Sequence, residues 1–264
     1  MTTGETSTTG VGQERSVQVA GLNVQYWEGG AGAPLVVVHH DIGNNGWTDL
    51  YERLAGDFRV IVPELPGYGK SDRPAWARHP RDLAMLLGLM LDKLDLDAVT
   101  LVGLGFGGWI AAEMAVMNQP RIRRLVLVGA MGIKPSEGEI LDQMMIDLKD
   151  YVATGCASQE AFVRLFGDEV PREQTMVWDY AREMTARIAW KPIMFSHQLP
   201  HLIGGVEVPA LVVWGRDNRV VPLVCGEAYA RAMPNARLEI VEDAGQWVDL
   251  EQPEKLAAMI KTMK

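Results

Sequence analysis

Short apolar runs alternate with segments of helical periodicity along most of this chain, and this alternation restricts the fold more than any other feature. The segment Leu35–His39 is apolar up to its terminal histidine, which is typical of a strand buried on both faces of a sheet. Alternating strands and helices predict an α/β fold: a mostly parallel twisted sheet with helices on both faces. The predicted strands are the hairpin Ser16–Tyr26, Leu35–His39, Arg59–Val62, Ala98–Leu104, Arg124–Val128, Ala210–Val213 and Arg237–Val241. The predicted core helices are Trp47–Leu54, Pro80–Leu94, Gly107–Met117 and Pro253–Met263.

The alternation stops between Gly132 and about Val206, where only helical patterns continue. These patterns cover Glu139–Val152, Gln159–Phe166 and Glu173–Trp190. A long insertion with regular periodicity favours a folded helical cap over a plain surface excursion. The sequence therefore predicts three parts. They are a disordered lead-in at 1–15, a core formed by 16–132 and 206–264, and a helical cap at 133–205.

Five motifs follow predicted strands, at the edge of a parallel sheet where active sites are usually built. They are His39-His40-Asp41, the loop 66–72 (PGYGKSD), the turn 103–108 (GLGFGG), the loop 214–222 (WGRDNRVVP) and the loop 243–247 (DAGQW). In this order they resemble the α/β-hydrolase fold family over nearly the whole chain from about Val17. The chain is most similar to capped members, such as carbon–carbon bond hydrolases, epoxide hydrolases and small esterases.

The resemblance implies a Ser-His-Asp triad, and this sequence departs from it at two positions. Gly105 stands where the nucleophilic serine of the elbow belongs, and Gln246 stands where the catalytic histidine belongs. Asp217 matches the triad acid, and we expect the Gln246 amide to donate to it; the alternative is that Gln246 orients a substrate. Glycine offers no nucleophile, and a neutral amide does not carry a proton near pH 7.

Gly105 is expected at a tight strand-to-helix turn with positive φ, a geometry that costs other residues about 1–3 kcal/mol. A degenerate triad of this kind has three interpretations. The site has relaxed in a non-catalytic protein, the reaction needs no nucleophile, or the chain is an engineered inactive variant.

A third departure lies in the oxyanion loop, where most relatives have small or apolar groups after the first histidine. Here the loop carries His40 and Asp41. An enclosed carboxylate tends to have a raised pKa, so Asp41 is a candidate general acid or base, with His40 as the other candidate. Capping of the turn 44–47 is an equal alternative for Asp41. The resemblance also implies an oxyanion hole that contains the amide of Phe106, and it implies that His39 packs in the core.

The remaining candidate residues are large side chains near the expected cavity. Trp247 follows Gln246, and the cap supplies Met144, Trp178 and Arg182. We expect these four residues to bind substrate, because one face of a cap must look into the cavity. The alternative is that Met144 and Trp178 belong to the core of the cap, and that Arg182 is solvated.

Composition excludes several classes of partner. The formal net charge is −9, which disfavours nucleic acid and anionic membrane surfaces. No apolar stretch approaches the roughly 20 residues that span a bilayer, and residues 1–15 lack the apolar centre of a signal peptide. The two cysteines have no metal-type spacing. We therefore expect a cytoplasmic protein without metal or cofactor that binds a small molecule, either as a monomer or as a homodimer.

The sequence thus supports one leading hypothesis and two alternatives. The leading hypothesis is a cofactor-free enzyme that acts non-covalently on a small or medium apolar carbonyl compound through the oxyanion hole. Its reaction would be that of a lyase, isomerase or cyclase, or a direct addition of water. The alternatives are a non-catalytic ligand-binding pseudo-hydrolase, and a hydrolase with an unusual triad or an engineered inactive variant.

Overall fold

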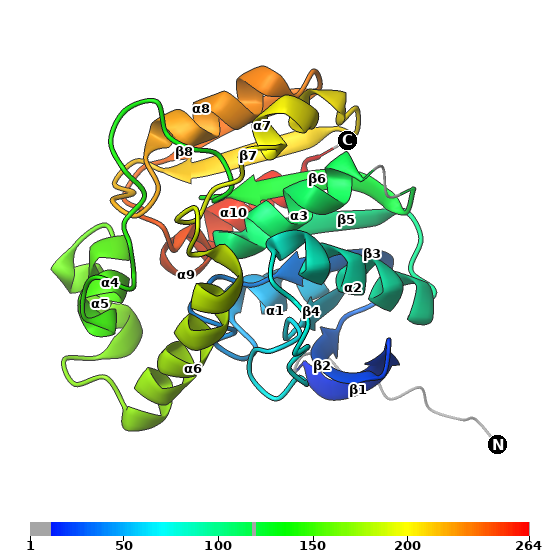
Figure 1. The fold of residues 1–264 in the computed structure, drawn as a ribbon, viewed down its shortest axis with the longest axis horizontal. Coiled ribbons are helices and arrows are strands. Elements are labelled where there is room, and N and C mark those ends of the chain that lie inside the picture. Colours follow the sequence, from blue (N-terminus) through cyan, green and yellow to red (C-terminus); the bar gives the residue numbers. More distant parts are fainter. Residues whose placement is uncertain (1–11, 118–119, 264) are drawn as a thin grey trace.

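The computed structural model describes residues 12–117 and 120–263, and its centre is one sheet of eight strands (Figure 1). The strands are β1 (Gln13–Val19), β2 (Leu22–Gly29), β3 (Ala33–Val38), β4 (Phe58–Pro63), β5 (Val99–Leu104), β6 (Ile122–Val128), β7 (Ala210–Gly215) and β8 (Ala236–Val241). Their order across the sheet is β1-β2-β4-β3-β5-β6-β7-β8. The pairs β1–β2 and β2–β4 are antiparallel, and the five pairs that follow across the sheet, from β4–β3 to β7–β8, are parallel. The predicted α/β-hydrolase architecture is confirmed.

The antiparallel hairpin at the start of the sheet begins earlier than the sequence predicts. Gln13, Glu14 and Arg15 already pair with β2, so the predicted disordered lead-in is wrong at these three residues. Residues 1–11 of that predicted lead-in lie outside the described residues.

Helices cover both faces of the sheet (Figure 1). One hydrophobic cluster joins the sheet to α2 (Pro80–Lys93), α3 (Phe106–Val116) and α8 (Leu223–Ala232). A second cluster joins the opposite face to α1 (Asp49–Ala55) and α10 (Pro253–Lys261). Because both faces are covered, β5 and β7 are buried at every residue.

Helix α3 packs very closely on β5, and Gly103 makes this approach possible. A Cβ at Gly103 would lie 2.5 Å from both the Gly107 oxygen and the Gly108 Cα. Such overpacking costs about 1–3 kcal/mol. We expect Gly103→Ala to lower the free energy of unfolding by about 2 kcal/mol in urea denaturation. Gly205→Ala is the matched control, because a Cβ there meets nothing within 4 Å. Equal stability of the two variants would contradict this packing argument.

The excursion between β6 and β7 contains three helices that lie beside the sheet rather than on its faces (Figure 1). They are α4 (Leu148–Gly155), α5 (Gln159–Phe166) and α6 (Arg172–Ala189). The excursion leaves and returns at one place, where Gly132 N donates to Met194 O and Ser196 N donates to Gly132 O, both at 2.9 Å. The boundaries of the cap stay a prediction, and these bonds favour its end near Ser196.

The predicted helix Glu139–Val152 is wrong in its first half. Helix α4 begins only at Leu148, where the Asp147 side chain accepts from Lys149 N at 2.8 Å. The preceding segment is irregular, and Leu141 N donates to Val220 O at 2.9 Å. This course lets Gln143 reach the interior, where it is 2% exposed. After the cap, α7 (Leu199–Leu202) and a 3-10 turn at Ile203–Gly205 lead to β7.

Candidate functional site

The turn between β5 and α3 has the geometry of a nucleophile elbow with glycine at its tip. Gly105 lies directly before α3, with φ +51° and ψ −111°. Its oxygen accepts from Gly108 N and Met131 N, each at 3.0 Å. Phe106 is the first residue of α3, so its amide has no acceptor within the helix. The predicted positive φ of Gly105 at a strand-to-helix turn is confirmed.

The imidazole of His40 lies over this turn. A Cβ at Gly105 would be 2.5 Å from His40 Nδ1 and 2.8 Å from Gln246 Nε2, so the histidine ring occupies the place of a side chain on the elbow. His40 Nδ1 is buried and has no hydrogen-bond partner among the described residues. The other ring nitrogen, Nε2, lies 2.8 Å from Asp249 Oδ1. His40 therefore directs its one unpaired polar atom at the elbow.

Asp41 is fully buried, and its carboxylate is held by the cap. Its Oδ2 accepts from the Tyr151 hydroxyl at 2.7 Å and from Gln143 Nε2 at 2.9 Å. Its Oδ1 has no partner within the described chain, and the same holds for Gln143 Oε1. Burial raises the pKa of Asp41, although the two donors and nearby His40 oppose this effect. Burial and the Asp41 charge raise the pKa of Tyr151, so Tyr151 remains a donor. Asp41 does not serve as the N-cap of a helix, because its carboxylate binds the side chains of Tyr151 and Gln143 in the excursion between β6 and β7.

The raised pKa of Asp41 predicts a pH-dependent stability. The pKa of Asp41 is 3.8 in the unfolded chain and higher in the folded protein, so between these two pKa values the folded protein binds a proton that the unfolded chain has released. The stabilisation from this proton is complete below about pH 4 and is lost as pH rises through the pKa of the folded protein. Asp41→Asn does not titrate, so the variant does not lose stability in this way. We expect the melting temperature of the variant, relative to the natural protein, to increase from pH 4 to pH 8 in scanning calorimetry. Exposed Asp217→Asn is the control, and a flat difference for Asp41→Asn would contradict the assignment.

The Gln246 side chain is buried and fully paired. Its Nε2 donates to Gly129 O at 3.0 Å, and its Oε1 accepts from Asn218 Nδ2 at 2.7 Å. Asn218 Oδ1 in turn accepts from Val220 N at 3.0 Å and from Val221 N at 2.9 Å. The expected pairing of Gln246 with Asp217 is therefore wrong by one residue. Asp217 is exposed, and Asn218 supplies the side chain that faces position 246.

His39 has a structural role in the same loop. Its Nδ1 donates to His40 O at 2.6 Å, and its Nε2 accepts from Leu65 N at 3.1 Å. Burial lowers the pKa of His39 to about 4, so the ring is neutral at physiological pH. With both nitrogens bound to the main chain, His39 fixes the path of the loop that carries His40 and Asp41.

The structure brings only some of the predicted binding residues to this place. Trp247 is buried and meets His40 edge-on, with 4.8 Å between ring centroids. Phe106 is buried too, 6.3 Å from the Tyr68 ring. Trp178 is buried, but its ring contact is with Phe166 inside the cap, at 5.2 Å.

The other two predicted binding residues have no contact that places them at His40 or Asp41. Met144 is half-buried, and its amide donates to Asp142 Oδ1 at 2.9 Å. Arg182 donates to Gln143 O at 3.3 Å and to Ile146 O at 3.4 Å, so it braces the irregular segment before α4. Their predicted role in substrate binding stays untested.

Sequence reasoning missed four residues of this cluster: Gln143, Tyr151, Asn218 and Asp249. Asp249 lies on α9 (Val248–Glu251), between the motif 243–247 and the predicted helix Pro253–Met263. Asn218 belongs to the predicted motif 214–222, and only the fold distinguishes it from Asp217, because Asn218 faces Gln246 and Asp217 is exposed. Nothing in the sequence indicates that Gln143 belongs to the site, because the helical pattern around it predicted a regular helix.

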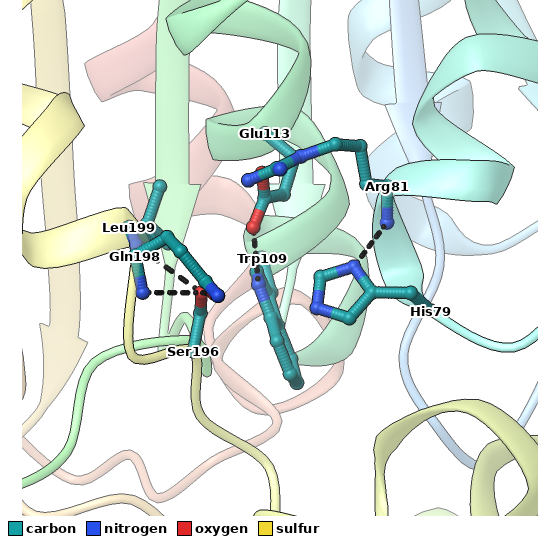
Figure 2. Close-up of polar contacts among 7 residues, drawn as sticks. All are labelled: His79, Arg81, Trp109, Glu113, Ser196, Gln198 and Leu199. Carbon is teal, nitrogen blue, oxygen red and sulfur yellow. Dashed lines mark hydrogen bonds and ion pairs between the residues drawn. The ribbon is translucent and has the colours of Figure 1, made fainter.

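A second buried polar cluster lies farther along α3, and its contacts mark it as structural. Glu113 is fully buried, and its Oε2 accepts from Arg81 Nε at 2.9 Å and Nη2 at 2.7 Å. Its Oε1 accepts from Trp109 Nε1 at 3.1 Å. Figure 2 shows this carboxylate between the guanidinium and the indole, with His79 beside them and Ser196 on the other side of Trp109. Both carboxylate oxygens are paired, so this cluster offers no free group for chemistry.

The described parts of the chain, 12–117 and 120–263, hold no group of three His, Cys, Asp or Glu side chains that could bind a metal ion. None of the helices described there is long and apolar enough to cross a bilayer. Cys156 and Cys225 are both buried free thiols, and burial raises the pKa of each to about 12.

Comparison with known proteins agrees with this geometry. The sequence model of the alpha/beta hydrolase family matches residues 35–259. A 2-hydroxy-6-oxononadienedioate/2-hydroxy-6-oxononatrienedioate hydrolase from Dechloromonas aromatica is 29% identical, over 90% of this chain and 89% of the relative. A 2-hydroxymuconate semialdehyde hydrolase from Pseudomonas sp. is 28% identical, over 93% and 92%. The solved meta-cleavage product hydrolase of Pseudomonas fluorescens IP01 superposes with a TM-score of 0.77 at 21% identity, over 93% of this chain and 95% of that one.

Proposed function

The chain belongs to the α/β-hydrolase family, and from that premise we propose that it is a cofactor-free enzyme that works without a covalent intermediate. Its substrate would be a small or medium apolar carbonyl compound held by an oxyanion hole. His40 and Asp41 would exchange the protons, in a lyase, isomerase, cyclase or direct water-addition reaction. The observation that carries this proposal is the position of His40 Nδ1 over Gly105, where the elbow presents a nucleophile in the rest of the family.

The three triad positions of this chain support a reaction without a nucleophile. Gly105 has no side chain, Gln246 is neutral, and Asn218 is a neutral amide facing Gln246. None of these residues forms an acyl intermediate or carries a proton at neutral pH. A covalent triad mechanism is thereby disfavoured, and the groups that can exchange protons are those of the neighbouring oxyanion loop.

His40 and Asp41 have complementary properties for such chemistry. His40 presents a ring nitrogen without a hydrogen-bond partner in the described chain, and an imidazole nitrogen can accept or donate a proton. Burial raises the pKa of Asp41, and its Oδ1 has no partner within the described chain, which suits a proton donor. The Phe106 amide at the start of α3 has no acceptor within the helix, so it could stabilise a developing oxyanion. In this proposal the elbow supplies the hydrogen-bond donor and the oxyanion loop supplies the base and the acid.

The relatives support a carbonyl substrate. Their names describe oxo and semialdehyde compounds, and each relative is a hydrolase of such a compound. A substrate must displace part of the cap to enter, because His40 is 2% exposed and Asp41 is fully buried. The bonds from Gln143 and Tyr151 to Asp41 are the ones that entry would open.

A non-catalytic ligand-binding protein is the alternative, and proton exchange distinguishes the two. Those of the proposed reactions that pass through an enolate abstract a proton next to the carbonyl, so they exchange that hydrogen with D2O, whereas direct water addition is detected as turnover. We expect NMR on a panel of aliphatic and aryl ketones and keto acids to show catalysed exchange with the natural protein. His40→Gln and Asp41→Asn should each slow it by ~10²-fold or more, while exposed Asp217→Asn leaves it unchanged. Ligand binding without any exchange or turnover would favour the non-catalytic alternative.

An organophosphonate probe tests the absence of a nucleophile separately. The probe should leave no covalent adduct at the elbow, because Gly105 carries no hydroxyl. Intact-mass spectrometry measures this result. A stoichiometric adduct would show an activated nucleophile elsewhere and would favour the hydrolase with an unusual triad.

A further inference from the structure

His40 and Asp249 form a buried pair that joins segments 209 residues apart in the sequence. Asp249 is carried by α9, the short helix after the Gln246–Trp247 loop. Its Oδ1 lies 2.8 Å from His40 Nε2, and each side chain is only 3% exposed. No catalytic position expected from the family resemblance includes Asp249, so this contact needs its own explanation.

We propose that Asp249 is a positioning residue that fixes the tautomer of His40, so that Nε2 carries the hydrogen and Nδ1 is the proton acceptor over Gly105. A carboxylate only accepts hydrogen bonds, so the ring nitrogen that faces it must be the donor. In a neutral imidazole the other nitrogen is then bare. The inference rests on the proposed function for its catalytic use, while the tautomer itself is a property of the ligand-free protein.

The surroundings of His40 support this assignment. The Trp247 ring stands at 84° to the imidazole and 4.8 Å from it, which limits rotation of the ring about its attachment. Two other titratable groups face His40: the neutral ring of His39 and the Asp41 carboxyl. Neither group binds His40 Nδ1, which has no hydrogen-bond partner within the described chain. Nδ1 is therefore left for a ligand, and Asp249 acts on the opposite side of the ring.

Helix capping does not account for Asp249. It is the second residue of α9, and Trp247 rather than Asp249 precedes the helix. The nearby carboxylate that does bind main-chain amides is Glu251, which accepts from Ala157 N and Gly245 N, both at 2.7 Å. Glu251 thus holds the loop structure, and Asp249 binds His40. The acid–base pair of this site is therefore Asp249 and His40, whereas Asn218 and Gln246 form a separate, neutral pair.

NMR of the full chain with 15N-labelled histidine tests the tautomer without any substrate. The chain has five histidines, and the His40 signals are those lost in His40→Gln. At a pH where titration shows His40 to be neutral, we expect hydrogen on Nε2 and a bare Nδ1. Asp249→Asn should shift the population toward hydrogen on Nδ1, because an amide also donates. Asp217→Asn is the matched control, exposed and expected to leave the His40 signals unchanged.

Two outcomes would overturn the proposal. One is hydrogen on Nδ1 in the natural protein, which needs no folded variant to observe. The other is a tautomer that does not respond in a folded Asp249→Asn protein. In the ketone exchange assay, Asp249→Asn should lower kcat by on the order of 10²-fold with KM nearly unchanged. If the natural protein shows the expected tautomer but no exchange, the proposed function fails and the positioning of His40 stands.

Discussion

Arg81→Ala is expected to destabilise the protein by about 3–5 kcal/mol, because it leaves a buried carboxylate without its cation. Glu113 is fully buried, and Arg81 supplies two of its three hydrogen bonds. The effect should be near the lower value, since the Arg81 side chain is 36% exposed and its removal admits water to Glu113. Urea denaturation measures the loss, which corresponds to roughly 10 °C in melting temperature for a protein of this size.

A second substitution separates charge from packing in this result. Arg81→Ala combined with Glu113→Gln removes the uncompensated charge and keeps the shape of the side chain and its contact with Trp109. We expect the double variant to be more stable than Arg81→Ala alone, which gives a large coupling energy between the two residues. Additive effects would contradict the view that the Glu113 charge dominates. The pair matters to the site because Glu113 and Trp109 anchor α3, the helix that begins at Phe106.

The sequence predicted the sheet well because its strands are buried on both faces and read as continuous apolar runs. The segments Val99–Leu104 and Ala210–Gly215 are fully buried, and no surface requirement obscures their pattern. The elbow was predictable for a related reason: a glycine-rich turn between strand and helix has few alternatives. The positive φ of Gly105 followed directly from that placement.

The cap and the acid loop were harder to predict because tertiary contacts decide them. Gln143 lies in a segment with helical periodicity, yet it leaves the helix because its amide binds buried Asp41. Asn218 and Asp217 are adjacent polar residues in one loop, and sequence alone gives little reason to prefer either. Their roles separate only in the fold, where Asn218 meets Gln246 and Asp217 is exposed. The His40–Asp249 bond joins distant segments, so no local pattern contains it.

The residues at the positions that we propose to depart from the family contact one another. A Cβ on residue 105 would lie 2.5 Å from His40 Nδ1, so a serine at the elbow would require the His40 ring to move. Asn218 and Gln246 form a neutral pair with complementary donor and acceptor, which gives the buried Gln246 oxygen a partner. Asp249 pairs with His40, whose ring lies over Gly105. A single loss of serine would not require these other changes, and their mutual fit argues against an engineered knock-out.

These contacts predict that restoring the triad residues alone will not give esterase activity, and that removing the His40 ring from the elbow as well will give it. Gly105→Ser, Asn218→Asp and Gln246→His together rebuild the residue types of the family, but His40 Nδ1 would lie 2.5 Å from the new Cβ. We therefore expect this three-residue variant to remain without esterase activity. Adding His40→Gly removes the ring, and adding Asp249→Asn removes the carboxylate that would otherwise lose its partner.

The five-residue variant should gain hydrolysis of p-nitrophenyl acetate by about 10²–10⁴-fold over the natural protein, a fraction of what an intact triad contributes. It should also take up one organophosphonate on Ser at position 105, detected by intact mass, while the three-residue variant does not. Melting curves establish that both variants are folded. If the folded five-residue variant is as inert as the natural protein, the hole or the loops are out of register for acyl transfer. If the three-residue variant is active, His40 does not obstruct the elbow, and the argument that it has taken the nucleophile's place is wrong.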